Sequence, residues 1–135
     1  MARIKARELA FKLVFEDLFG IHTAKEMFGG LFEEEKDYKA INQEDIEYIE
    51  WIRREIAEHA EELDRIIAEH AQGWAIDRLD KVDLSILRLA VCEMRYREDV
   101  TTAIAINAAV ELAKAYATDN SPSFINGVLG AIAKK

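Results

Sequence analysis

Proline and glycine are so sparse in this chain that long helices are its natural local structure. The single proline is Pro122, and the six glycines stand at positions 20, 29, 30, 73, 127 and 130. These residues interrupt regular structure, so the segments between them are long enough for ordinary helices. No segment alternates convincingly between apolar and polar residues with the period of two that a half-buried strand requires. We therefore predict an all-α fold, a compact bundle of six to seven helices joined by short loops.

The N-terminal half contains three helical segments. Apolar residues over 3–19 fall on two faces at helical spacing, which predicts a helix packed between neighbours. A shorter helix is expected from residue 22 or 23 to residue 32 at most, followed by an acidic connection over 33–41. Asn42 is then the expected N-cap of a long helix that breaks near 59–62 and stops at Gly73.

The C-terminal half contains three more. Asp80 is expected to start a helix that is apolar on most sides over 82–96 and is therefore central, with Asp83 completing a short-armed capping box. Thr101 or Thr102 caps an alanine-rich helix that reaches residue 117. The last helix is expected to use Ser121 as its cap, with Pro122 in its first turn.

An Asn126-Gly127 pair lies inside that last predicted helix. Glycine in a helix interior costs about 1 kcal/mol relative to alanine. This choice invites one of two explanations, tight packing between helices or a partner that approaches the backbone.

Composition indicates one globular domain over residues 1–135. Half of the residues are apolar, and the single cysteine, Cys92, lies in an apolar run typical of a small buried side chain. The basic start is not followed by the apolar run of a signal peptide, and no stretch of 18 apolar residues is present to span a membrane. We expect a cytoplasmic protein without a cofactor.

The net charge of −8 by itself disfavours a nucleic-acid binder, but the charge is unevenly distributed. Residues 33–69 contain fourteen acidic and five basic side chains, whereas the first twelve residues contain four basic ones and a single Glu. The four are Arg3, Lys5, Arg7 and Lys12. Cations at a helix N-terminus oppose the helix dipole, which favours a polyanionic partner, although a solvated helix end is the alternative.

Enzymatic chemistry finds little support. The histidines at 22, 59 and 70 have no i, i+4 partner among themselves, and one cysteine cannot build a thiolate metal site. The acidic residues of the middle third are interpreted as a solvated face. No phosphate-binding glycine loop, nucleophile elbow or dinucleotide fingerprint is present, so we expect no enzyme.

Four segments occur in a characteristic order and spacing. They are the basic run Arg-Ile-Lys-Ala-Arg-Glu-Leu-Ala at 3–10, the segments 74–90 and 104–114, and the run Phe-Ile-Asn-Gly-Val-Leu at 124–129. Together they resemble the NusB family of transcription antitermination factors. The resemblance covers nearly the whole chain and is weakest over 21–72.

The resemblance implies a factor that binds the boxA element of nascent RNA through the basic end and nearby loops. It also implies a heterodimer with the ribosomal protein NusE, in complexes with elongating RNA polymerase. We expect Arg3, Lys5, Arg7 and Lys12 to contact the RNA.

A second RNA surface is suggested by the loop before the last helix. An exposed Phe124 can stack on an unpaired base, and Asn120 can hydrogen-bond the edge of that base. The alternative for Phe124 is a core position in the first turn. The family normally has Lys before this Phe, whereas this chain has Ser123, so one phosphate-seeking charge is missing.

The resemblance places the NusE surface around the start of the central helix. Asp77 and Asp83 are the expected contacts there, although capping and helix-dipole effects explain these acids equally well. A further departure from the family is Ala108, where Glu is common.

Two other functions stay open at this point. One is a helical protein-interaction module without RNA binding, which the net charge favours. The other is the NusB-like RNA-binding domain of some RNA cytosine methyltransferases, which requires a long catalytic extension that is not expected here because the sequence ends at Lys135.

Overall fold

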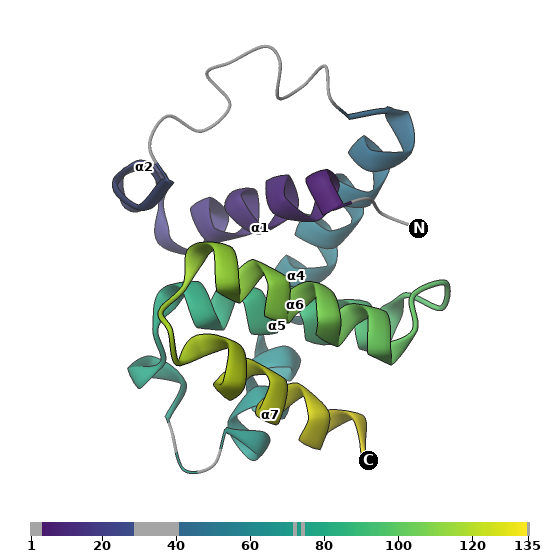
Figure 1. Ribbon diagram of the computed structural model, residues 1–135. Helices are drawn as coiled ribbons and strands as arrows, with labels where there is room; N and C mark the ends of the chain where they lie inside the picture. Colours follow the sequence, from purple (N-terminus) through teal and green to yellow (C-terminus); the bar gives the residue numbers. More distant parts are fainter. Residues whose placement is uncertain (1–3, 29–40, 72, 74, 135) are drawn as a thin grey trace.

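The computed structural model describes residues 4–28, 41–71, 73 and 75–134, which form a bundle of six α-helices (Figure 1). The elements are α1 (Ile4–Phe19), α2 (Ile21–Phe28), α4 (Gln43–His70), a short 3-10 turn η1 (Ile76–Arg78), α5 (Lys81–Tyr96), α6 (Thr102–Tyr116) and α7 (Ser121–Ala133). No strand occurs in these ranges, so the predicted all-α fold is confirmed. The expected acidic connection over 33–41 lies mostly outside the described residues.

Helix α5 is the centre of the bundle. It packs against α1, α4, α6 and α7, and these four helices surround it (Figure 1). Its buried apolar side chains are Val82, Leu84, Ile86, Leu87, Leu89, Ala90, Val91 and Cys92. Burial raises the pKa of the Cys92 thiol to about 12, so this side chain is a protonated, packed hydrophobe as predicted.

Helix α1 is buried on two faces, as its sequence pattern predicts, and packs against α2, α4, α5 and α6. Phe11 and Phe15 contact Phe28 of α2, with ring centroids 5.4 and 5.1 Å apart. Helix α2 begins at Ile21, slightly earlier than expected, because Gly20 adopts a left-handed conformation (φ 92°) that lets the chain turn at once. Ile4 is the exception on the apolar face, since it is 78% exposed.

Helix α4 starts and bends where the sequence predicts. Asn42 accepts a hydrogen bond from Asp45 N–H (2.9 Å), and its own N–H donates to the Asp45 carboxylate (3.1 Å), which forms a capping box. The helix is kinked at His59, which has φ −113° and ψ 18°. None of the helices in the described ranges combines the length and the apolar character that crossing a membrane requires.

Asp80 and Thr101 cap α5 and α6 as expected: Asp80 accepts from the N–H groups of Val82 (2.8 Å) and Asp83 (3.3 Å), and Thr101 accepts from Ile104 N–H. The return hydrogen bond from Asp83 that would complete a capping box does not form among the described residues. The predicted cap of α7 is wrong: Asn120 takes the cap position, and Ser121 is already helical. Ser121 is buried, and its hydroxyl lies 2.9 Å from the Thr118 hydroxyl, so it bridges side chains and does not cap the helix.

The glycines of α7 are not required by tight packing. A Cβ added at Gly127 or Gly130 meets no atom within 4 Å. One of the two explanations for the Asn126-Gly127 pair is thereby removed, and the approach of a partner to this helix face remains.

We predict that Gly127→Ala raises the free energy of unfolding by about 0.5–1 kcal/mol, because alanine loses less backbone entropy in a helix. Urea denaturation followed by circular dichroism measures the change. Gly73→Ala is the matched control and should destabilise, since Gly73 has a φ of 89°. A drop in stability in Gly127→Ala would show that this helix face is packed after all.

Candidate functional site

Arg7, one of the expected RNA contacts, is almost entirely buried, which makes it a poor candidate for a surface contact. It is 6% exposed, and its guanidinium donates two hydrogen bonds to Glu93 of α5, from Nε to Oε1 (3.2 Å) and from Nη2 to Oε2 (3.1 Å). The hydroxyl of Tyr48 in α4 also donates to Glu93. The guanidinium therefore joins α1 to the centre of the bundle.

The charge states of this cluster follow from its surroundings. Burial by itself lowers the pKa of Arg7, but the hydrogen bond and charge of Glu93 outweigh burial and raise it. Burial and the charge of Glu93 raise the pKa of Tyr48 well above its usual value. Arg7 therefore stays cationic and Tyr48 stays a neutral phenol that donates to the carboxylate.

Lys5 and Lys12 are the partly exposed cations of α1. They are seven residues apart, so they share one helix face and are separated by roughly 10 Å along the axis. The ammonium of Lys12 lies 5.1 Å from the centre of the Tyr116 ring at the end of α6, within range of a cation–π interaction. Tyr116 in turn donates a 2.6 Å hydrogen bond to Glu8. Arg3 lies outside the described residues.

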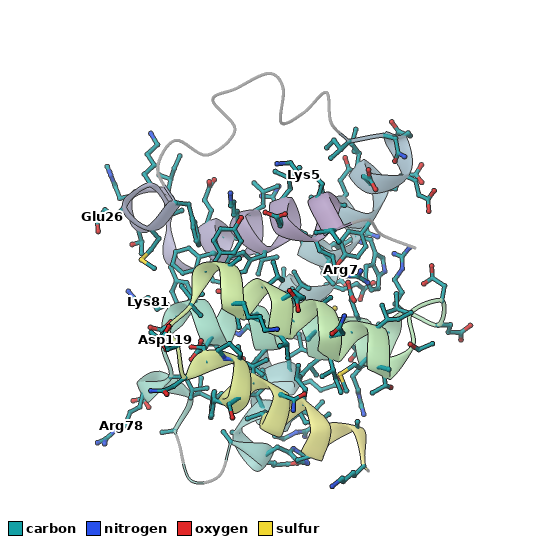
Figure 2. The ribbon with its side chains drawn as sticks, in the orientation of Figure 1. Lys5, Arg7, Glu26, Arg78, Lys81 and Asp119 are labelled. Atoms are coloured by element: carbon teal, nitrogen blue, oxygen red, sulfur yellow. The ribbon has the colours of Figure 1, made fainter. Side chains whose placement is uncertain are left out.

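The cations continue beyond α1 toward α5. Lys81, the first residue of α5, has its ammonium 5.5 Å from the centre of the Phe19 ring at the end of α1. Figure 2 shows Lys5 projecting outward from α1, and Lys81, Arg78 and Asp119 on the side where η1 and the loop before α7 lie. The sequence alone did not predict that Lys81 lies beside Phe19, because no local signal relates α1 to the start of α5.

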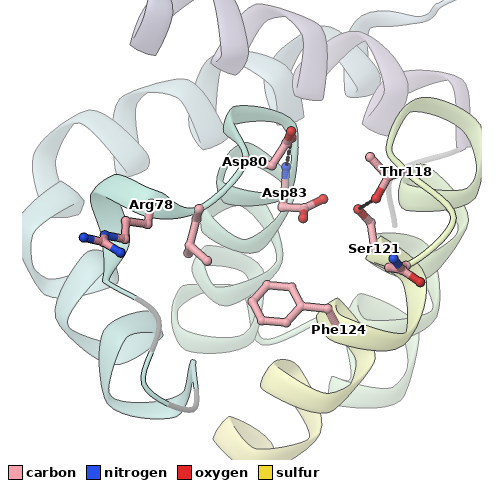
Figure 3. A pocket seen from close by; sticks show the side chains of 8 residues that line it. Arg78, Asp80, Asp83, Thr118, Ser121 and Phe124 are labelled. Carbon is pink, nitrogen blue, oxygen red and sulfur yellow. Dashed lines mark hydrogen bonds between the residues drawn. The ribbon is translucent and has the colours of Figure 1, made fainter.

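Phe124, Asn120 and Asp83 line a single pocket of about 330 Å³ (Figure 3). The full lining is Arg78, Leu79, Asp80, Asp83, Thr118, Asn120, Ser121 and Phe124. The expected RNA surface of α7 and the expected partner surface of α5 are thus one place. Phe124 is half-buried: it packs against the core cluster and its ring also lines the pocket. Phe124 therefore fits both alternatives considered for it, a core position in the first turn and an aromatic ring at the surface.

Asp83 is not the exposed partner contact that its position in the sequence suggested. It is 8% exposed, and Oδ1 has no hydrogen-bond partner among the described residues. Burial raises the pKa of this carboxyl, while the neighbouring Ser121 hydroxyl opposes the rise. Asp77, on η1, is exposed. Asp77 is therefore a solvated surface carboxylate, whereas Asp83 is a buried carboxylate at the pocket.

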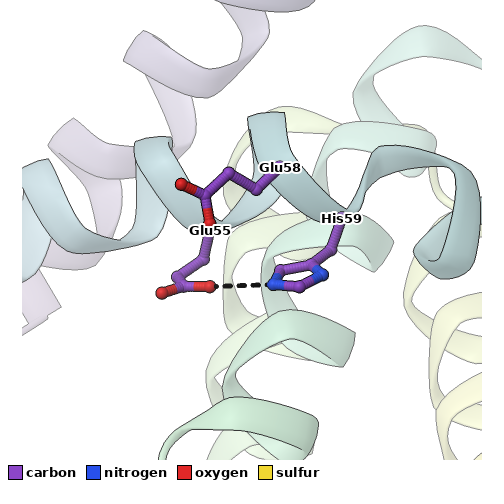
Figure 4. Close-up of side chains that lie close together, drawn as sticks. All are labelled: Glu55, Glu58 and His59. Atoms are coloured by element: carbon purple, nitrogen blue, oxygen red, sulfur yellow. Dashed lines mark ion pairs between the residues drawn. The ribbon is translucent and has the colours of Figure 1, made fainter.

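A cluster of possible metal ligands lies at the bend of α4 (Figure 4). Ligand atoms of Glu55, Glu58 and His59 lie within 4.8 Å of one another. His59 Nε2 pairs with Glu55 at 3.2 Å, and its ring stacks on Tyr96 with centroids 4.4 Å apart. These contacts give His59 a structural role in the kink.

Comparison with known proteins decides the family. Residues 4–134 match the NusB family. The transcription antitermination protein NusB of Clostridium novyi is 40% identical over 136 residues, 99% of both chains, and that of Acetivibrio thermocellus is also 40% identical, over 99% of this chain and 90% of its own.

Solved structures agree with the sequences. The crystal structure of T. maritima NusB has a TM-score of 0.81 at 28% identity, over 100% of this chain and 94% of its own. A crystal structure of the antitermination factors NusB and NusE in complex with dsRNA has a TM-score of 0.76 at 35% identity, over 98% and 96% of the two chains.

The chain belongs to the NusB family of transcription antitermination proteins. The structure shows where the two residues that depart from the NusB pattern lie. Ser123 is exposed on α7, and Ala108 is half-exposed in a groove between α1 and α6 that Ile4 and Leu112 also line. Both departures therefore change the surface of this NusB protein and leave its core unchanged.

We predict that Arg7→Ala lowers the free energy of unfolding by about 3–5 kcal/mol, because it leaves the Glu93 carboxylate buried without its partner. Lys5→Ala, on the surface of the same helix, should cost less than about 0.5 kcal/mol. Urea denaturation at neutral pH measures both.

A double variant, Arg7→Met with Glu93→Leu, should recover much of the stability, since it removes both charges. A small effect of Arg7→Ala, equal to that of Lys5→Ala, would contradict the structural role of Arg7.

Proposed function

We propose that this chain is a non-enzymatic NusB factor that binds boxA-type single-stranded RNA as a heterodimer with the ribosomal protein NusE. The complex joins elongating RNA polymerase in the cytoplasm and suppresses termination. The observation that carries the proposal is the match, over nearly the full length of both chains, to the NusB of a solved complex with NusE and dsRNA.

The proposed RNA surface runs along α1 and ends at the start of α7. Arg3, Lys5 and Lys12 attract phosphates, and Tyr116 continues the surface toward the loop that contains Asn120. Phe124 then offers an aromatic ring to an unpaired base. Phosphate contacts fix position and base contacts supply specificity, so the two ends of this surface have different functions.

The proposed NusE surface lies beside the RNA surface. A protein with a net charge of −8 repels RNA, so a partner that neutralises part of this charge and adds phosphate contacts is required for tight binding. Asp77 is exposed on η1, next to pocket-lining Arg78, and is the proposed contact. Asp83 is buried beneath this surface and is considered separately below.

We predict that replacing Lys5 and Lys12 by Ala weakens binding to RNA of any sequence. The slope of log affinity against log salt should fall by roughly 0.7 for each phosphate of a single-stranded RNA that the variant no longer neutralises. Fluorescence anisotropy over a salt series measures it, with Lys134→Ala at the end of α7 as the control. An unchanged slope in the double variant would remove α1 from the RNA surface.

We also predict that NusE tightens RNA binding about tenfold or more, which corresponds to about 1.4 kcal/mol of coupling, and that RNA tightens NusE binding by the same factor. Calorimetry with and without each partner measures both. Asp77→Lys should weaken the heterodimer, whereas Glu111→Lys, on α6, should not. Absence of a complex with NusE would favour the protein-interaction module with another partner.

A further inference from the structure

The pocket between η1, α5 and α7 combines three chemical features. Phe124 supplies an aromatic wall, Asp83 supplies a carboxylate, and Ser121 and Thr118 supply hydroxyls (Figure 3). Its volume of about 330 Å³ lies at the lower end of the range for small-ligand sites. The pocket therefore has the shape and the mixed chemistry of a binding site for one planar polar group.

Asp83 is the polar group in this pocket that lacks a full set of partners. The residue is 8% exposed, and Oδ1 has no hydrogen-bond partner in the described part of the chain. An acceptor buried without a donor is costly. Although Arg78, Asn120, Ser121 and Thr118 also line the pocket, no donor of the described residues reaches Oδ1. Because rotation about the last torsion of Asp is soft, a ligand in the pocket that supplies an N–H donor can pair with this carboxylate.

The neighbouring acid does not supply an alternative site. Asp80 uses its carboxylate to cap α5 through the N–H groups of Val82 and Asp83. Arg78 on the rim, together with the N-termini of α5 and α7, offsets part of the negative charge of the two acids. An uncharged ligand with an N–H donor and an aromatic face therefore fits better than an anion.

We propose that this pocket takes one unstacked nucleobase with an exocyclic amino group, which stacks on Phe124 and donates to the Asp83 carboxylate. The proposal rests on the RNA-binding function above and adds a base preference to it. Cytosine, adenine and guanine present amino groups on their pairing edges. The only ring donor of uracil lies between two carbonyl oxygens, which the carboxylate repels, so uracil is the disfavoured base.

The test uses wild-type protein with NusE and short labelled oligouridylates in which one central base is U, C, A or G. Wild type should bind the substituted oligonucleotides about tenfold more tightly than oligouridylate, the size of one hydrogen bond to a charged group. Asp83→Asn should reduce this preference to less than about twofold, because an amide both donates and accepts.

Asp77→Asn is the matched control, since it removes the same charge from an exposed site beside the pocket. It should keep the full base preference. An unchanged preference in Asp83→Asn overturns the proposal, and so does a loss of NusE binding in Asp83→Asn without a change in preference, which assigns Asp83 to a protein contact. Failure of the wild-type complex to bind any of these RNAs contradicts the function itself and not only the base preference.

A second measurement needs no variant at Asp83. Cytidine and uridine monophosphates are added to the isotope-labelled wild-type protein, and the backbone amide signals of Ser121 and Phe124 are followed by NMR. Cytidine monophosphate should shift both signals at concentrations where uridine monophosphate does not. Equal shifts with the two nucleotides, or no shift with either, overturn the proposal.

Discussion

The buried ion pair between Arg7 and Glu93 fixes the position of α1 on the rest of the bundle. Burying two charges is expensive, and it is tolerated here because two hydrogen bonds join them and Tyr48 donates a third to the carboxylate. Since Arg7 faces inward, Lys5 and Lys12 necessarily face outward on the same helix. The buried contact of Arg7 with Glu93 thus determines that the Lys5 and Lys12 side chains point toward solvent.

The proposed RNA surface built on this helix combines two kinds of chemistry. Cations lie on α1 and at the start of α5, where we propose that they attract phosphate, and the pocket at Phe124 is the proposed place for a base. The carboxylates around the pocket are unsuitable for phosphate but suitable for the donor groups of a base. In this proposal, the negative charge of the protein contributes to selectivity, and the partner supplies additional positive charge.

Local signals account for what the sequence predicted correctly. The caps Asn42, Asp80 and Thr101 and the bend at His59 depend on a few neighbouring residues, so they can be predicted without tertiary structure. Arg7 could not be placed, because its partner is 86 residues away and an inward Arg has the same local sequence as an outward one. The meeting of Asp83 with Phe124 is likewise a product of packing between α5 and α7.

We propose that one continuous surface, from α1 to the start of α7, binds RNA. A titration of the isotope-labelled protein with boxA-type RNA in the presence of NusE, followed by NMR, tests this surface directly. We expect RNA to shift the signals of Lys5, Lys12, Tyr116, Asn120 and Phe124 beyond the shifts caused by NusE alone. Shifts confined to α4 or to the end of α7, with these five residues unchanged, would exclude a continuous RNA surface.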